Sequence, residues 1–135
     1  RELDVPIYIH TGEQPYALPA TADFIAGAFP DVKIILGHLG TQGELYTIEA
    51  LLVAERHPNV YLETSWAMPH MIIEAVHEAG AARLIFGSNT PPLEQTQQIM
   101  NVEEAMAFDP PIGMAAAEED IYKVLGGNLA RLLGL

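Results

Sequence analysis

The sequence has no cysteine and only six Lys and Arg residues among its 135. Without cysteine it can form neither disulfides nor thiolate metal sites, which fits a cytoplasmic protein. Against those six stand 18 Asp and Glu, giving a formal net charge of −12. This balance argues against nucleic acid or an anionic membrane surface as a partner, since both favour clustered Lys and Arg. A small-molecule ligand is compatible with it.

Long apolar runs are also missing. No run approaches the roughly 20 apolar residues that a membrane-spanning helix needs, and no secretory signal is visible. The hydrophobic fraction of 50% argues against disorder, and the length suits one domain, residues 1–135. The chain begins with Arg1 rather than Met, and a strand pattern follows almost at once. We therefore expect further sequence upstream.

What the chain does contain is a regular alternation of two patterns. Apolar runs of the kind that strands buried on both faces need occur at residues 5–10, 32–38, 59–64 and 83–88. Between them, apolar residues at helical spacing, bounded by proline or glycine, predict helices over 19–29, 45–57 and 69–80. Crossovers of this type are nearly always right-handed. We therefore expect four parallel strands in sequence order.

The last third of the chain has a different pattern. It predicts helices over residues 93–108, 118–125 and 129–133, with a proline-containing loop at 109–113. Asn128 is expected to be the N-cap of the last helix. The predicted fold is α/β, with parallel βα units and extra C-terminal helices. Four such strands are half of an eight-stranded barrel, and a flavodoxin-like open sheet is the alternative.

Polar residues follow the predicted strands, at the edge where parallel α/β folds build their sites: His10, His38, Ser65 and Asn89. Neighbouring parallel strands lie about 4.8 Å apart, so His10 and His38 could share one ion or one substrate group. The alternative is that both are hydrogen-bonded histidines facing a loop. Asn89 could equally be a turn residue at a strand end.

With these residues in place, the chain resembles the carboxyl-terminal half of amidohydrolase-related proteins, the branch of the amidohydrolase superfamily that includes aminocarboxymuconate-semialdehyde decarboxylase. The segments that carry the resemblance are Pro6-Ile7-Tyr8-Ile9-His10-Thr11-Gly12, residues 29–40 with Gly37-His38-Leu39-Gly40, residues 59–65, Phe86-Gly87-Ser88, and residues 127–134. Singly these motifs are weak, but their order and spacing are fairly specific.

The resemblance implies a (β/α)8 barrel with these strands as numbers five to eight. It further implies that His10 is a ligand of a divalent metal and that His38 binds the metal or the substrate. We expect the metal to be zinc. Two features depart from the family. The His-x-His pair of its first strand has no counterpart here, and Asn89 replaces an aspartate that binds metal and handles a proton. An asparagine amide cannot act as a general base near neutral pH.

Three further residues are candidates for contact with substrate. Ser65 and Trp66 could line the pocket, and Glu13 lies in the loop after His10. Glu63 is expected to face the helices. None of the six basic residues stands clearly at a strand's carboxyl end, so a clamp for a substrate carboxylate would belong to sequence outside this chain.

Two functions follow as hypotheses. The first is a metal-dependent hydrolase or non-oxidative decarboxylase that acts on a small carboxylate-bearing or lactone substrate, with Asn89 and His38 at the reacting centre. The second is a catalytically impaired descendant that serves as a binding or assembly module. Four parallel strands leave two open edges. We therefore also expect a homo-oligomer if the chain exists alone.

Overall fold

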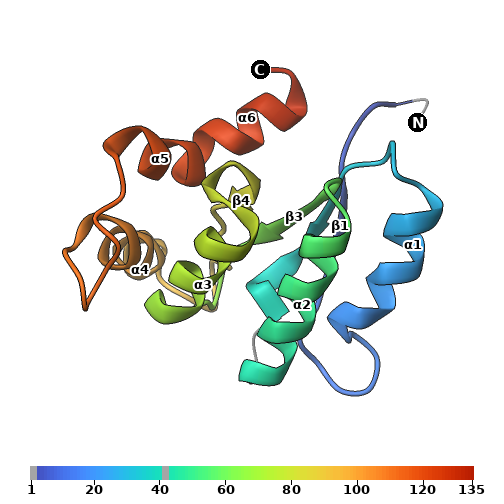
Figure 1. Ribbon diagram of the computed structural model, residues 1–135, viewed down its shortest axis with the longest axis horizontal. Coiled ribbons are helices and arrows are strands. Elements are labelled where there is room, and N and C mark those ends of the chain that lie inside the picture. The colour runs from blue at the N-terminus through green and yellow to red at the C-terminus, as the bar shows by residue number, and fades with distance from the viewer. Residues whose placement is uncertain (1–2, 41–42) are drawn as a thin grey trace.

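The computed structural model describes residues 3–40 and 43–135. It contains four strands, β1 (Ile7–Ile9), β2 (Ile34–Leu36), β3 (Val60–Glu63) and β4 (Leu84–Ile85). All neighbouring pairs are parallel, and the sheet order is β1-β2-β3-β4 (Figure 1). This confirms the expected parallel strands in sequence order. It differs from the flavodoxin-like alternative, in which the first strand lies inside the sheet.

Three helices cover one face of the sheet: α1 (Ala22–Ala28), α2 (Glu44–Arg56) and α3 (Pro69–Ala79). A short 3-10 turn (Pro19–Thr21) precedes α1. The buried side chains of these helices form one apolar cluster with residues from β2, β3 and β4, among them Ile34, Leu36, Val60, Leu62 and Leu84. Alternation along each strand directs these residues to the helical face. We call this face of the sheet the outer face.

The opposite, inner face carries Tyr8, Ile35, Tyr61, Glu63 and Ile85, as the strand register requires. The last helix covers part of it. After α4 (Gln95–Ala107), the chain forms α5 (Glu118–Tyr122), a π-helical turn (Lys123–Gly127) and α6 (Asn128–Leu133). Leu132 packs on Ile35 and Ile85, with Leu129 and Tyr61 beside them. Figure 1 shows α5 and α6 together along the upper edge of the view, away from α1 and α2.

The helix that ends the chain differs from its expected form. Asn128 has helical backbone angles, φ −68° and ψ −43°, because the chain passes through Gly126 and Gly127 as a π-helical turn without a break. The prediction that Asn128 caps a new helix is therefore wrong. Its buried amide instead donates hydrogen bonds to the carbonyl oxygens of Ala81 and Leu84, at 2.7 Å each. It ties the last helix to the start of β4.

Two strands also differ from expectation. β1 is an edge strand with Ile7 and Tyr8 about half exposed, at 48% and 51%, so it is not buried on both faces. β4 is only two residues long, and the next backbone amide, that of Phe86, donates to the carbonyl of Val124 in the π-helical turn. Within the described ranges, no helix combines the length and apolar character needed to cross a membrane.

Candidate functional site

The carboxyl ends of β1 and β2 bring His10 and His38 into direct contact. Nδ1 of His10 lies 2.9 Å from Nε2 of His38, and the two ring centroids are 4.7 Å apart. The turn Gly37–Gly40 produces this contact because it places His38 at φ 65° and Leu39 at φ 49°. Such left-handed angles are uncommon for residues other than glycine. The expected pairing of these two histidines is present in the geometry.

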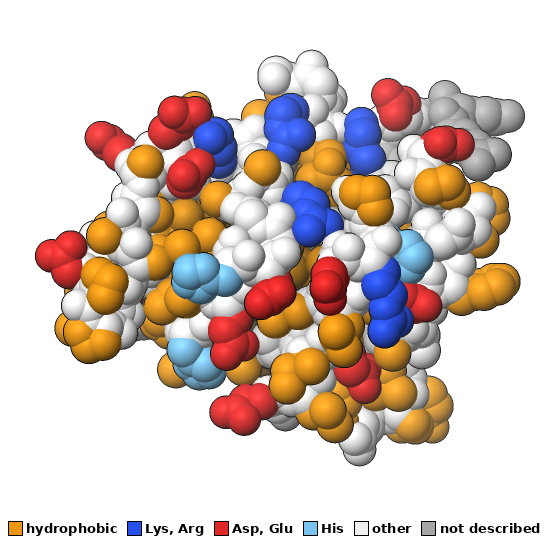
Figure 2. All heavy atoms as spheres, in the orientation of Figure 1, with side chains coloured by type: hydrophobic (Ala, Val, Ile, Leu, Met, Phe, Trp, Pro, Cys, Tyr) orange, Lys and Arg blue, Asp and Glu red, His pale blue; other side chains and the backbone are white. Residues whose placement is uncertain are grey.

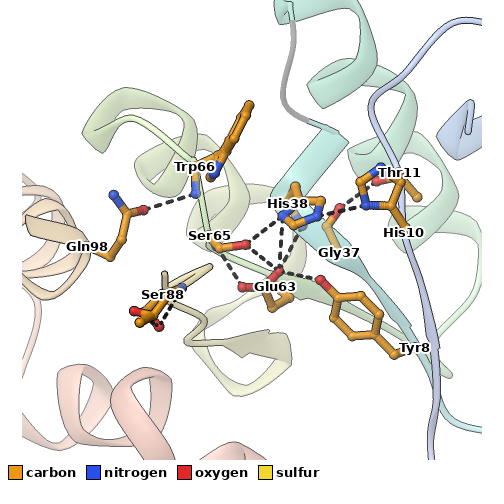
Figure 3. Close-up of polar contacts among 11 residues, drawn as sticks. Tyr8, His10, Thr11, Gly37, His38, Glu63, Ser65, Trp66, Ser88 and Gln98 are labelled. Atoms are coloured by element: carbon orange, nitrogen blue, oxygen red, sulfur yellow. Dashed lines mark hydrogen bonds and ion pairs between the residues drawn. The ribbon is translucent and has the colours of Figure 1, made fainter. Parts of the chain in front are cut away.

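A buried carboxylate, Glu63 at the end of β3, lies at the centre of the site (Figure 3). Its Oε2 accepts hydrogen bonds from the Tyr8 hydroxyl, the His38 backbone N–H and the Ser65 hydroxyl, each at 2.9 Å. Its Oε1 accepts the Ser65 backbone N–H at 2.8 Å. Four donors from three strand ends thus converge on one side chain.

The expectation that Glu63 faces the helices is wrong. Leu62 points to the outer face and is fully buried there, so strand alternation sends Glu63 to the inner face. Tyr8 was not recognised as a site residue either. The signal for both residues was the alternation of strand side chains between two faces. Tyr8 and Glu63 belong to the set that lies opposite the apolar helical face.

Ser65 and Trp66 follow Glu63 directly, and both lie against His38. The Ser65 hydroxyl is 2.6 Å from Nδ1 of His38, and it is buried. The Trp66 ring centroid is 6.3 Å from that of His38, and the side chain remains 40% exposed. The backbone N–H of Trp66 donates to the side-chain oxygen of Gln98 in α4, at 3.0 Å (Figure 3). Trp66 thus forms an open wall beside the histidines.

Glu13 lies at the outer margin of the site. Its carboxylate is 3.6 Å from Nε2 of His10, and both side chains are at least half exposed. A backbone bridge between Glu13 and Ala17 shapes the loop that carries it. The contribution of such an exposed contact to binding is small unless a ligand excludes water from it.

Asn89 lines a pocket of about 280 Å³ on the inner face of the sheet. Other residues of the pocket wall are Tyr8, Glu63, Ser65, Phe86 and Leu129. Asn89 has a φ of 53°, the left-handed conformation that asparagine tolerates better than most residues. Glu63 and Ser65, which both contact His38, therefore also line this pocket, and Asn89 lies on its wall.

Two glycines make room for the central carboxylate and its tyrosine. A Cβ added at Gly87 would lie on Oε1 of Glu63, and one added at Gly37 would lie on the hydroxyl of Tyr8. Neither position tolerates a side chain without displacing the group that faces it. The close approach of these two backbone segments is therefore part of how the site is built.

Burial sets the protonation states of two site residues. It lowers the pKa of His38, and the nearby Glu63 carboxylate only partly offsets this, so the imidazole is neutral near pH 7. Burial and then the charge of Glu63 raise the pKa of Tyr8 well above its ordinary value. Tyr8 therefore remains a protonated phenol that can donate to Glu63.

The two histidines fit a metal centre only as part of a ligand set. Two nitrogens that each bind one zinc ion at about 2.0–2.1 Å can lie no more than about 4 Å apart. The separation of 2.9 Å between His10 and His38 meets this limit. Among the described residues, however, no group of three or more His, Cys, Asp or Glu is placed to hold a metal. A complete centre would need ligands from outside these residues.

The described basic residues lie away from the strand ends that carry the histidines. Lys33 and Arg83 precede β2 and β4, and Arg131 lies in α6, where it donates to the carbonyl of Ala82 at 2.8 Å. Arg56 pairs with Asp23, and Lys123 with Glu119 and Asp120. On the face seen in Figure 2, most of the blue side chains lie in the upper half of the view. Arg1 falls outside the described residues.

Comparison with known proteins places this geometry in context. A family model described as amidohydrolase matches residues 1–135. The structure is similar to that of 2,6-dihydroxybenzoate decarboxylase complexed with 2,6-dihydroxybenzoate, with a TM-score of 0.70 and 22% identity, covering 98% of this chain and 52% of that chain. A search of curated protein sequences found no match.

Two further solved structures are similar and contain metal. A dihydroxybenzoic acid decarboxylase from Polaromonas sp. JS666, with bound manganese and the inhibitor 2-nitroresorcinol, has a TM-score of 0.68 and 22% identity, covering 99% of this chain and 51% of that chain. An amidohydrolase from Burkholderia multivorans with bound zinc has a TM-score of 0.68 and 16% identity, covering 87% and 49%. The chain thus spans about half the length of the solved structures it matches. At these identities the likeness is one of fold.

Proposed function

Because the chain belongs to the amidohydrolase family, we propose that it is the carboxyl-terminal half of a metal-dependent enzyme of this superfamily. In this proposal β1 to β4 are strands five to eight of a (β/α)8 barrel, and residues 1–135 are one partial domain. The observation that carries it is the contact between His10 and His38 at the carboxyl ends of neighbouring strands. The catalytic residues of such barrels come from the carboxyl ends of several strands.

The reaction we favour is non-oxidative decarboxylation of a small aromatic carboxylic acid. Hydrolysis needs a group that takes a proton from water, and the amide of Asn89 cannot do this. Decarboxylation instead needs a proton delivered to the carbon that loses CO2. Nε2 of His38 can pass on such a proton after taking it up from a substrate hydroxyl or from solvent. The two dihydroxybenzoate decarboxylases among the similar structures support the same choice.

Each candidate site residue would have its own role. His10 and His38 would hold a divalent metal or the substrate itself, and the metal, zinc or manganese, would polarise the substrate oxygens when bound. Asn89 would orient a substrate oxygen by hydrogen bonding, without taking a proton. Ser65 and Trp66 would line the substrate pocket, and Glu13 would contribute a polar contact beside His10.

The test uses a longer chain that carries four further βα units ahead of residue 1. We expect it to contain divalent metal by elemental analysis and to release CO2 from 2,6-dihydroxybenzoate. The variant His10→Ala should lose both properties. His77→Ala is the matched control, because His77 is an exposed residue in the last turn of α3. Absence of both metal and turnover in the longer wild-type chain would refute the proposal.

Asn89 favours a second candidate, a catalytically impaired descendant that binds ligands or assembles with other proteins. The variant Asn89→Asp restores a carboxylate on the pocket wall, next to a pocket that already holds Glu63. In the longer chain, a gain in metal affinity or turnover would favour the enzyme lineage. Unchanged values for both would favour the binding module.

Three further expectations stay predictions. The partner is a small molecule rather than nucleic acid or a membrane, the location is cytoplasmic, and the chain forms a homo-oligomer if it exists alone. For the last, two half-barrels could pair through the exposed edge of β1, where Ile7 and Tyr8 are about half exposed. A monomeric mass by light scattering, together with a cooperative thermal transition, would contradict the homo-oligomer.

A further inference from the structure

We propose that Glu63 is a positioning residue that fixes the proton of His38 on Nδ1, acting through the Ser65 hydroxyl. This leaves the lone pair of Nε2 pointing toward His10. The inference deepens the proposed function and rests on it for its catalytic meaning, because a free Nε2 is what a metal ion or a substrate proton requires. The proton arrangement itself is a property of the chain and can be measured without metal or substrate.

All the hydrogen bonds to Glu63 are directed at its carboxyl oxygens. The backbone N–H groups of His38 and Ser65 can only donate, and they point at Oε2 and Oε1, at 2.9 and 2.8 Å. The Tyr8 phenol keeps its proton and donates to Oε2 at 2.9 Å. Both carboxyl oxygens are therefore acceptors in these contacts.

Ser65 lies between Glu63 and His38 in the chain of contacts shown in Figure 3. The Ser65 hydroxyl lies 2.9 Å from Oε2 of Glu63, and since this oxygen is an acceptor, Ser65 donates its only proton there. The Ser65 oxygen can then only accept toward His38, whose Nδ1 lies 2.6 Å away. Nδ1 of His38 must therefore carry the proton.

The other ring nitrogen of His38, Nε2, faces His10. A neutral imidazole with its proton on Nδ1 has a lone pair on Nε2. Nε2 of His38 faces Nδ1 of His10 at 2.9 Å, so in the metal-free chain His10 is the donor in that contact. All the bonds from His10 through His38 and Ser65 then run in one direction and end at Glu63.

The backbone around Glu63 is built to keep it in place. The side chain is 5% exposed, and Gly87 leaves the space that Oε1 occupies. Gly37 likewise leaves the space for the Tyr8 hydroxyl, which holds Oε2 from the other side. Partners behind a catalytic or metal-binding histidine select its tautomer and ring orientation, and their loss typically costs about 10–100-fold in metal affinity or activity.

The test is a tautomer measurement by NMR on the metal-free chain with 15N-labelled histidine. Long-range 1H–15N correlations distinguish a protonated Nδ1 from a protonated Nε2, and assignment uses the variant His38→Gln. We expect wild-type His38 to carry its proton on Nδ1. Ser65→Ala and Glu63→Gln should each lower that fraction, because the first removes the acceptor and the second replaces one carboxylate oxygen by a donor. Circular dichroism confirms that each variant is folded.

Tyr8→Phe is the matched control, since it removes a donor to the same Oε2 but leaves the path from Glu63 to His38 intact. It should keep the wild-type tautomer. A proton on Nε2 in the wild-type chain would overturn the inference outright. Retention of the Nδ1 proton in Ser65→Ala would overturn the serine bridge, and retention in Glu63→Gln would overturn the role of Glu63.

The outcome is separable from that of the proposed function. If the expected tautomer is found but the longer chain neither binds metal nor releases CO2, only the proposed enzyme fails. If the longer chain is active, Glu63→Gln should lower kcat by about 10–100-fold. Tyr8→Phe should lower it less.

Discussion

The amino and carboxyl ends of the parallel strands carry different kinds of side chains. Toward the amino end, Leu132 of α6 packs on the inner face, and Asn128 and Arg131 donate to backbone carbonyls. At the carboxyl end, hydroxyl, imidazole and backbone N–H donors converge on the buried acid Glu63. At the amino end, the polar side chains named here bond to backbone carbonyls. At the carboxyl end, polar groups face a pocket.

This difference separates the residues that only stabilise the fold from those that also arrange the polar groups of the site. Side chains at the amino end can be judged by the free energy of unfolding alone. Those at the carboxyl end hold polar groups in fixed positions, so their loss should alter protonation or binding as well as stability. Measuring the free energy of unfolding and the protonation of His38 separately therefore tests whether the two ends are independent.

The largest effect on stability is expected at the amino end, from Leu132→Ala. Leu132 is 3% exposed and packs on Ile35 and Ile85, so truncation should cost about 2–5 kcal/mol of unfolding free energy, measured by urea denaturation. Leu135→Ala is the control, because that side chain is 91% exposed and should change little. In the folded variant, the tautomer of His38 should not change. A shift there would show that the two ends are coupled.

A smaller loss of stability, with a change at the site, is expected for Gly87→Ala. The added Cβ overlaps Oε1 of Glu63, and overpacking of this kind typically costs about 1–3 kcal/mol. Displacement of Glu63 should also lower the fraction of His38 with its proton on Nδ1, as NMR can measure. Gly126→Ala is the matched control, since no atom lies within 4 Å of its added Cβ. An unchanged His38 signal in Gly87→Ala would contradict the central role of Glu63.

The smallest effect is expected at the partly exposed group of Asp23, His57 and Arg56, which joins α1 to the end of α2. The hydrogen bond from His57 at 3.0 Å, and then that from Arg56, lower the pKa of Asp23 below its ordinary value of 3.8. Stability from this group is present above pH 3.8 and is lost as the pH falls through the lowered value. Asp23→Asn should thus lower the Tm slightly near neutral pH but not at the acid limit. A difference that grows toward acid pH would contradict this sign.

The fold was largely predictable from the sequence, because periodicity reports burial. The four strands, their parallel order and the helices between them follow from apolar runs and helical spacing. What failed depended on tertiary context. Asn128 looks like a cap, yet its amide binds the carbonyls of Ala81 and Leu84, which are remote in sequence. The exposure of β1 follows from its place at the edge of the sheet, which a local pattern does not contain.

The site was predictable in part, for a related reason. His10 and His38 could be paired because consecutive parallel strands are neighbours, and this contact is present. Glu63 was assigned to the wrong face because alternation along β3 groups it with Tyr61, opposite Val60 and Leu62, but does not say which of the two faces the helices cover. The left-handed turn at His38 was not predicted either, and it is that turn which aims the ring at both His10 and Ser65.

The space that Gly87 leaves for Glu63 has a consequence for how such sequences can diverge. A side chain at position 87 fits without displacing its neighbour only when position 63 carries something shorter than glutamate, and the same overlap links position 37 to position 8. In a set of relatives, each pair of positions should therefore vary in concert. A glycine lost at 87 should accompany an acid lost at 63.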